Sequence, residues 1–426
     1  QQTVPEKNTY MNSTYFDEIY HAGTAWEYIM GYNPYETTHP PLGKVIMGLG
    51  IKMFGMNPFG WRFMGTIVGI LMIPVMYLLA MVVLNKTRYA AIAAILMTFD
   101  FMHFTQNSIA IIDSYGVFFI MLMFLFMGIY YRMSFYKNSF IKTLIPLGLS
   151  GIFFGLGAAS KWIGLYAGAG LAVVFFLVLF KRYREYQFVT GGKNEGFKIE
   201  KEKAEIIKKK FKKYTLITLA FCIVFFIIIP IGIYAASYLP IIKAQEGRGL
   251  EYILNSQKYM FNYHSGLTAE HTLASPWYEW PLIIKPMWYY SDSTLYGTGQ
   301  MTSIAAFGNP AVWWTGTAAI IWLLITMFKS RSTDKMHTFV LIAFLAQFLP
   351  WILVPRSMFI YHYFASVPFI ILMITMMIQS IERKKWYRKE VTYLYMAIVI
   401  LLFVLFYPVT AGVQISSEYG RMLKWM

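Results

Sequence analysis

Long apolar runs separated by short polar segments dominate the chain. Ten runs are long enough to cross about 30 Å of hydrocarbon, and a segment inside a bilayer must satisfy its own backbone, so we expect helices. The predicted fold class is therefore an all-α polytopic membrane protein with about ten transmembrane helices. The runs cover residues 58–84, 90–108, 115–131, 143–160, 162–180, 215–239, 310–328, 337–354, 364–381 and 392–408.

The composition agrees with this interpretation. Of the 426 residues, 57% are hydrophobic, 19% are aromatic and only 14% are charged. A soluble globular domain carries more charge and less apolar surface than this.

Lys and Arg residues are concentrated in alternate loops. Five loops hold 25 of the 37 basic residues, and the positive-inside rule makes these loops cytoplasmic. The net charge of +16 thus reflects topology, and we expect no nucleic-acid partner. The five groups are Lys86 with Arg88, Arg132 with Lys137 and Lys142, residues 181–213, Lys329 with Arg331 and Lys335, and residues 383–389.

This topology divides the chain into seven segments and places the N-terminus outside. We expect a further helix upstream of Gln1 to have delivered it there, because no signal-peptide pattern is present. The segments are an extracytoplasmic loop (1–57), transmembrane helices (58–180), a basic cytoplasmic loop (181–214), a transmembrane helix (215–239), an aromatic-rich extracytoplasmic loop (240–309), transmembrane helices (310–408) and an extracytoplasmic tail (409–426).

Asp17 and Glu18 lie side by side in the first outer loop, within an aromatic segment. Adjacent carboxylates diverge, so we do not expect them to act on one atom as a glycosidase-like pair. A solvated surface charge is the ordinary alternative. The aromatic surroundings favour a catalytic base instead, because they limit water and tune the pKa of a carboxylate.

Three cations lie at the outer ends of apolar runs: Arg62, Lys161 and Arg356. Interfacial snorkelling is one explanation for all three. The other is that together they hold a lipid phosphate at headgroup depth.

Asp100 and His103 fall inside an apolar run, where a carboxylate costs about 2.5 to 3.5 kcal/mol and needs a partner. We interpret them as a structural polar contact. His264 and His271 lack the i, i+4 spacing of a metal-binding helix, so we expect no metal site.

Taken in order, several of these pieces resemble the protein O-mannosyltransferases, in particular the bacterial members. The similarity covers nearly the whole chain. The matching pieces are Asp17-Glu18, His39-Pro40-Pro41-Leu42-Gly43-Lys44, Arg62, Ser160-Lys161-Trp162-Ile163-Gly164-Leu165, His271, Ala274-Ser275-Pro276-Trp277, Trp280-Pro281-Leu282, Gly308-Asn309-Pro310 and the segment from Arg356 to Tyr363.

The resemblance implies a GT-C fold of about eleven helices, in the bacterial plasma membrane, with an outward-facing active site. It implies a polyprenyl-phosphate sugar, typically mannose, as donor and Ser/Thr hydroxyls of exported proteins as acceptors. Asp17 would be the base, with Glu18 orienting it, and Arg62, Lys161 and Arg356 would bind the donor phosphate. Substrate contacts would come from His39, Asp113, His271, Trp277, Trp280, His362 and Tyr363.

Two features limit the resemblance. The outer loop of about seventy residues is too short for the β-trefoil MIR domain of eukaryotic members. Family members usually carry Arg where this chain has Ser108, five residues before Asp113, so a cation near the donor is missing. The residues also leave open whether the enzyme is a homodimer and whether a divalent cation assists.

The leading interpretation is an inverting, lipid-linked glycosyltransferase. A hydroxyl acceptor needs a base, whereas a phosphate leaving group departs as an anion and needs cations rather than a proton donor. Alternatives are a related transferase acting on a lipid or another envelope acceptor, a lipid transporter or flippase that grips a headgroup without reaction, and an inactive scaffold. No internal repeat typical of a two-halved transporter is visible.

Overall fold

The computed structural model describes residues 7–135, 138–191, 199, 201–244, 248–267, 271–294, 299–329, 335–384 and 388–423. Lys137, Arg331 and residues 192–198 of the predicted basic loop lie outside this range.

Helices make up most of the described chain. They are α1 (Glu18–Met30), α2 (Leu42–Phe54), α3 (Pro58–Leu84), α4 (Thr87–Thr98), α5 (Phe101–Ser108), α6 (Asp113–Arg132), α7 (Phe140–Ser160), α8 (Ile163–Val189), α9 (Lys201–Ile223), α10 (Ile229–Ser237), α11 (Leu239–Ala244), α12 (Leu250–Gly266), α13 (Pro310–Lys329), α14 (Lys335–Phe348), α15 (Val367–Ile381), α16 (Lys389–Ala411) and α17 (Ser417–Leu423). A π-helical turn, η1 (Val224–Ile228), joins α9 to α10, and short 3-10 helices are η2 (Trp277–Leu282), η3 (Leu349–Leu353) and η4 (Ile360–Ser366).

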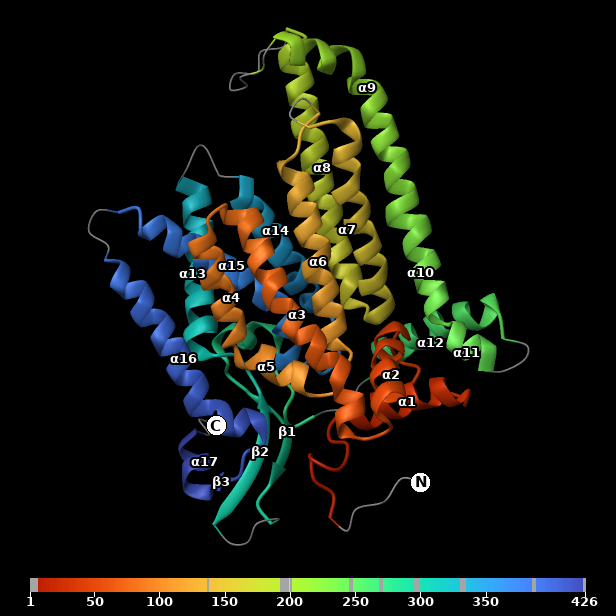
Figure 1. Ribbon diagram of the computed structural model, residues 1–426, viewed down its shortest axis with the longest axis vertical. Helices are drawn as coiled ribbons and strands as arrows, with labels where there is room; N and C mark the ends of the chain where they lie inside the picture. Colours follow the sequence, from red (N-terminus) through yellow and green to blue (C-terminus); the bar gives the residue numbers. More distant parts are fainter. Residues whose placement is uncertain are drawn as a thin grey trace.

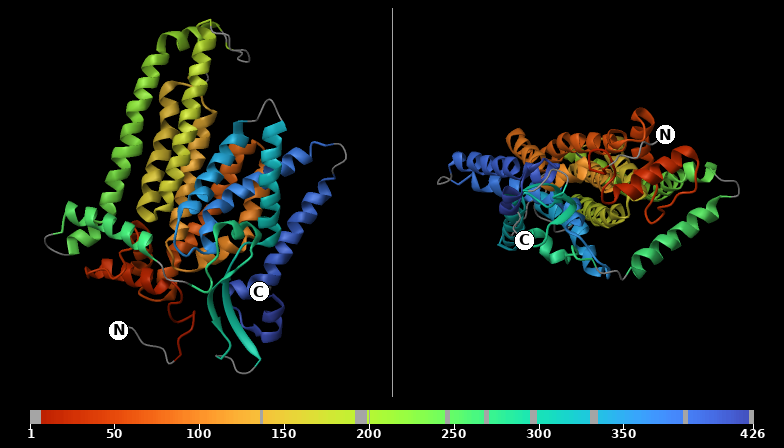
Figure 2. Two further views of the ribbon diagram at one scale, coloured as in Figure 1. Left: turned by 180° about the vertical axis from the view of Figure 1, so that it is seen from behind. Right: turned by 90° about the horizontal axis from the view of Figure 1, so that it is seen from below.

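Nine helical segments of the described chain are long and apolar enough to span a membrane, and α4 is a shorter apolar helix. The all-α polytopic class is thus confirmed. In Figure 1 these helices run side by side, while α1, α2, α12 and α17 gather at one end of the bundle. The views of Figure 2 show that the long α9 and α10 segment stands at the edge of the bundle.

The predicted single span over residues 90–108 is wrong, because the chain breaks between α4 and α5. Asp100 has an extended backbone there, and its Oδ1 accepts a hydrogen bond from the backbone N–H of His103, which caps α5. Its Oδ2 accepts from the backbone N–H of Asn309 at 3.1 Å and from Nε1 of Trp313 at 3.0 Å. The buried carboxylate therefore joins the helix break to the start of α13, which confirms the expected structural contact.

A small antiparallel sheet, which the sequence did not predict, lies at the same end as α1. Strands β1 (Met287–Asp292) and β2 (Gln300–Ala306) form a hairpin, and β3 (Ile415–Ser416) pairs with β2. The aromatic run Trp288, Tyr289 and Tyr290 suits a half-buried strand. The ladder shifts register between Trp288 and Tyr290. Tyr289 donates from its hydroxyl to Oε1 of Gln106 at 3.2 Å, so the hairpin is anchored on α5.

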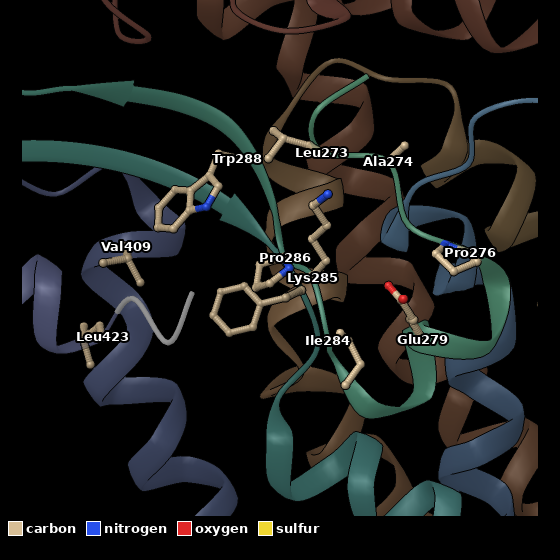
Figure 3. Close-up of a pocket in the computed structure, with 11 residues that line it drawn as sticks. Leu273, Ala274, Pro276, Glu279, Ile284, Lys285, Pro286, Trp288, Val409 and Leu423 are labelled. Atoms are coloured by element: carbon tan, nitrogen blue, oxygen red, sulfur yellow. The ribbon is translucent and has the colours of Figure 1, made fainter. Parts of the chain in front are cut away.

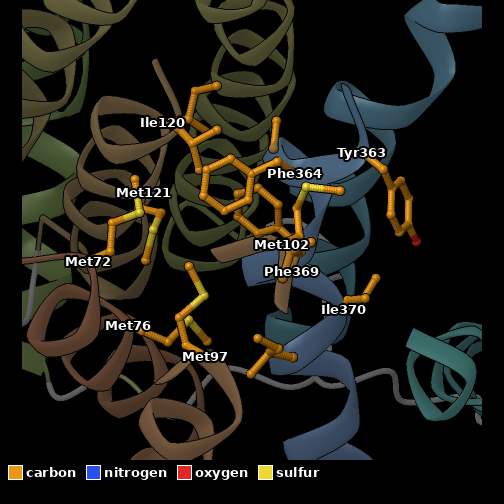
Figure 4. Packing of buried hydrophobic residues seen from close by; sticks show 14 of the residues in the cluster. Met72, Met76, Met97, Met102, Ile120, Met121, Tyr363, Phe364, Phe369 and Ile370 are labelled. Atoms are coloured by element: carbon orange, nitrogen blue, oxygen red, sulfur yellow. The ribbon is translucent and has the colours of Figure 1, made fainter. Parts of the chain in front are cut away.

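The core is rich in methionine and phenylalanine. Met72 and Met76 of α3 meet Met97 of α4, Met121 of α6 and Phe369 of α15, and all five are buried (Figure 4). Flexible thioethers fill the irregular space between these helices. The packing also fixes α6, whose first residue, Asp113, lines the site described next.

We expect Asp100→Ala to lower the free energy of unfolding by about 2 to 4 kcal/mol, because each orphaned buried donor costs about 1 to 3 kcal/mol. Thermal unfolding in detergent measures the change. Asp100→Asn keeps an acceptor and should cost clearly less. Equal stability of the parent and the alanine variant would contradict this role.

Candidate active site

A polar cavity of about 520 Å³ lies at the end of the bundle occupied by α1 and α12. Six of the predicted catalytic, phosphate-binding and substrate-binding residues line it, although they come from widely separated segments. They are Asp17, His39, Asp113, Lys161, Arg356 and His362.

A second, mostly apolar cavity of about 240 Å³ adjoins the first. Its apolar lining includes Ile163, Trp351 and Leu353. The two cavities share part of their walls, so polar and apolar spaces meet at one boundary. The shared lining residues are Thr38, His39, Lys161, His264, Arg356 and His362.

Asp17 stands at the N-terminus of α1, where its backbone carbonyl accepts from the N–H groups of Tyr20 and His21. The preceding residue, Phe16, has a φ of 51°, a left-handed backbone conformation that residues other than glycine rarely adopt. Its ring stacks on Tyr289 with 4.2 Å between centroids. The hairpin thus holds a strained turn that aims Asp17 into the polar cavity, and such strain is common at functional sites.

Burial raises the pKa of Asp17 to about 6. The ammonium of Lys161 lowers this pKa, whereas the carboxylates of Asp113 and Glu36 raise it. A carboxylate with a pKa this close to neutrality is ionised at pH 7 and still basic enough to take a proton from a hydroxyl in a transition state.

Two of the predicted phosphate-binding cations face the cavity. Lys161 follows α7 and donates from Nζ to both oxygens of Asp113, each at 2.7 Å, so much of its charge is balanced. Arg356 precedes η4 and forms no ion pair with any described residue. The guanidinium of Arg356 is therefore the cation with capacity for an added anion.

The structure places Glu18 and Arg62 together and away from both cavities. Arg62 donates from Nε and Nη2 to the two oxygens of Glu18, each at 2.7 Å, and Glu18 is fully buried. Oε1 of Glu18 also accepts from the backbone N–H of Ala110 at 2.9 Å. The predicted phosphate contact of Arg62 is not supported, because its planar fork is already engaged by a carboxylate.

Four other predicted substrate contacts also lie outside the two cavities. The indole of Trp280 is buried and donates to the backbone carbonyl of Ser275, and Trp277 packs on Phe348. Tyr363 belongs to the core cluster (Figure 4). The ring of His271 packs edge-on against Phe359.

Glu36 lines the polar cavity, although the sequence did not single it out. Its buried carboxylate accepts from Nζ of Lys44, from the Thr38 hydroxyl and from Nδ1 of His39, the last at 3.2 Å. Glu36 is the sole acidic residue between residues 31 and 44, three positions before His39. That isolated carboxylate beside a histidine was the available signal.

Ser108 faces neither cavity. Its hydroxyl donates to the carbonyl oxygen of Phe104 at 2.7 Å, one turn back in α5. Ser108 itself thus contributes no atom to the lining of either cavity.

A third hollow, of about 540 Å³, lies against the hairpin (Figure 3). Glu279, Lys285 and Trp288 point into it, and its remaining lining is mainly apolar. None of the six predicted residues that share the polar cavity lines it.

Comparison with known proteins assigns both halves of the chain. Residues 6–243 match the family model described as dolichyl-phosphate-mannose-protein mannosyltransferase. Residues 250–426 match the model of the C-terminal four-helix membrane region of protein-O-mannosyltransferase.

Curated relatives cover almost the whole chain. The polyprenol-phosphate-mannose--protein mannosyltransferase of Corynebacterium glutamicum is 26% identical, over 96% of this chain and 87% of its own length. The protein of the same name from Mycolicibacterium smegmatis is 25% identical, over 96% of this chain and 86% of its own length.

Solved structures show the same fold. The yeast protein O-mannosyltransferase Pmt1-Pmt2 complex bound to its sugar donor gives a TM-score of 0.80 at 14% identity, covering 98% of this chain and 89% of that one. ArnT from Cupriavidus metallidurans bound to undecaprenyl phosphate gives a TM-score of 0.56 at 13% identity, covering 97% of this chain and 69% of that one. These are GT-C membrane glycosyltransferases. The chain belongs to the dolichyl-phosphate-mannose-protein mannosyltransferase family.

Proposed function

We propose that the protein transfers mannose from a polyprenyl-phosphate carrier to Ser and Thr hydroxyls of exported proteins, with inversion at the sugar carbon. The arrangement that supports this is a polar cavity lined by Asp17, Lys161 and Arg356, which shares part of its wall with an apolar cavity. A polyprenyl-phosphate sugar has the same order of parts: an apolar tail, an anionic phosphate and a polar sugar.

The oxygen of the acceptor hydroxyl attacks C1 of the sugar, and Asp17 accepts the proton of that hydroxyl. The bond from C1 to the phosphate oxygen breaks, and polyprenyl phosphate leaves as an anion with the electron pair. Arg356 and Lys161 stabilise that developing charge, so no proton donor is needed. Asp113 keeps Lys161 in place, while His39 and His362 line the sugar side.

We place the reaction on the extracytoplasmic side of a bacterial plasma membrane. The end of α8 and the start of α9, which flank the predicted basic loop, lie at the opposite end of the bundle from α1 (Figure 1), and basic segments stay in the cytoplasm. No group of three or more potential metal ligands occurs among the described residues. Homodimer formation and help from a divalent cation stay predictions.

The transporter alternative needs ionisable groups along a path through the membrane. Asp100 and His103, the candidates for such a path, are held in fixed contacts: Asp100 by three donors and His103 through Nε2 to the carbonyl of Gly69 at 3.1 Å. Both residues thus have structural partners that a proton or ion relay would have to break. The family match favours the transferase.

Asp17→Asn should reduce kcat by about 100-fold or more, the size expected for loss of a general base. Its melting temperature should equal or exceed that of the parent at pH 7.5, because burial disfavours the ionised carboxylate that the amide replaces. Mannosyl transfer to a Ser/Thr-rich peptide and thermal unfolding measure the two effects. Activity within threefold of the parent would reject Asp17 as the base.

The pH profile provides a second check on the same residue. The base must be deprotonated, so kcat/KM should rise with pH up to about 6 and then level off, falling tenfold per pH unit on the acid side. A flat profile between pH 5 and pH 7, in protein that stays folded, would contradict the assignment.

Arg356→Gln should weaken donor binding by about 10- to 100-fold, because a hydrogen bond to a charged group contributes about 1.5 to 3 kcal/mol. Titration with a non-hydrolysable polyprenyl-phosphate mannose analogue gives the affinity. Lys209→Ala, in an exposed position of α9, is the control. Equal affinities of the two variants would remove Arg356 from the phosphate site.

Lys161→Gln should be tested with Asp113→Asn, so that no carboxylate is left unpaired.

Glu18→Gln and Arg62→Gln should each destabilise the protein by about 3 to 5 kcal/mol, because each leaves a buried charge without its partner. The double variant should lose less free energy of unfolding than the two single variants lose together. Unfolding of all four proteins in detergent gives the coupling, and additive losses would refute the pair. Donor affinity of the folded Arg62 variant should match the parent.

A further inference from the structure

We infer that His39 is a specificity residue that accepts a hydrogen bond from one hydroxyl of the transferred sugar, and that Glu36 and Lys44 are positioning residues that fix it for this task. The inference rests on the proposed function and deepens it. It follows from the hydrogen bonds of the His39 ring and from the place of that ring between the two cavities.

The partners of Nδ1 fix the tautomer of His39. Nδ1 lies 3.2 Å from Oε1 of Glu36 and 3.0 Å from Oγ1 of Thr38. An ionised carboxylate can only accept, and the Thr38 hydroxyl already donates its proton to Glu36. Both partners therefore require Nδ1 to carry the hydrogen. In a neutral ring, Nε2 is then left with a lone pair.

Lys44 keeps Glu36 in its ionised form. The Lys44 side chain is completely buried and donates from Nζ to the Glu36 carboxylate and to the Glu36 carbonyl oxygen, the latter at 3.0 Å. Burial alone would raise the pKa of Glu36, but Lys44 and His39 hold it well below its usual range. The charge of Glu36 is thus permanent, and its grip on Nδ1 does not depend on pH near neutrality.

His39 itself stays neutral. Burial lowers the pKa of its imidazole, and the cations Lys161 and Lys44 act in the same direction against the hydrogen bond and charge of Glu36. A proton taken up by Nε2 would place a further positive charge near those two cations. His39 is therefore suited to accept a hydrogen bond rather than to serve as a second base.

The location selects the sugar as the partner. His39 lines both the polar and the apolar cavity, as do Lys161 and Arg356, so it lies beside the proposed phosphate position. The phosphodiester of the donor has no hydrogen to give to a lone pair. The sugar hydroxyls next to that phosphodiester do, and a site built to bond a hydroxyl discriminates strongly against an analogue that lacks it.

The test combines ring substitutions with a series of donors. Polyprenyl-phosphate mannose and its 2-, 3-, 4- and 6-deoxy counterparts are compared by kcat/KM for peptide mannosylation and by Kd. The proteins are the parent, His39→Phe, which keeps a ring without an acceptor, and His39→Gln, which restores an acceptor oxygen. His337→Phe is the matched control, because it makes the same change at the start of α14, away from both cavities.

For one of the deoxy donors, kcat/KM should be about 10- to 100-fold lower than for the full donor in the parent and in His337→Phe. In His39→Phe the same comparison should differ by less than threefold. His39→Gln should recover part of the discrimination. The double variant Glu36→Gln with Lys44→Met removes the contact that holds the proton of His39 on Nδ1, and it leaves no charge unpaired. This variant should lose part of the discrimination against that deoxy donor. If every deoxy donor lowers kcat/KM and affinity by the same factor in the parent and in His39→Phe, the inference is wrong. A parent that binds these donors and transfers none would instead reject the proposed function, while the Kd values would still test His39.

Discussion

The buried ion pair between Glu18 and Arg62 is the contact on which the site depends. One carboxylate accepts from Nε and Nη2 of Arg62 on α3 and from the backbone N–H of Ala110 between α5 and α6. Two segments far apart in the sequence are thereby fixed to the start of α1. Asp17 immediately precedes this anchor, and the strained turn at Phe16 directs it the other way, into the polar cavity. Of the two adjacent carboxylates, Glu18 thus stabilises the fold, whereas Asp17 lines the cavity, where the proposed reaction needs a base.

Charge pairing around the cavity follows the same division. Glu36 is paired with Lys44, and Asp113 with Lys161. Among the described residues of the cavity wall, Asp17 and Arg356 are the charged groups of opposite sign without an ion pair. A carboxylate free to take a proton and a guanidinium free to receive an anion are the two groups that displacement of a phosphate by a hydroxyl requires. The ion pairs Glu36–Lys44 and Asp113–Lys161 form the polar surroundings of these two groups.

Local pattern explains most of the helices and also where prediction failed. The apolar runs set α3, α6, α7, α8 and α13, because hydrocarbon thickness and backbone hydrogen bonding leave few alternatives. The run over residues 90–108 begins as an apolar helix, but Asp100 ends that helix, and the partners that make this break favourable come from residues 309 and 313. The β1–β2 hairpin escaped prediction for a related reason. Its aromatic residues are also typical of a membrane interface, and only their pairing with β2 shows that they form a strand.

The sequence by itself determined the membrane class, the family and half of the proposed site residues, because hydrophobicity, charge asymmetry and short motifs are properties of the chain alone. Asp17, Lys161 and Arg356 carried chemistry that could be read from residue type and position. Only the tertiary structure decided which charges stay available. Arg62 and Arg356 look alike in sequence, yet one is held by Glu18 and the other faces the cavity. Likewise, the fold brings Lys44 and His39 to the carboxylate of Glu36. Pairing between distant charges depends on distances in space, and no spacing along the chain encodes them.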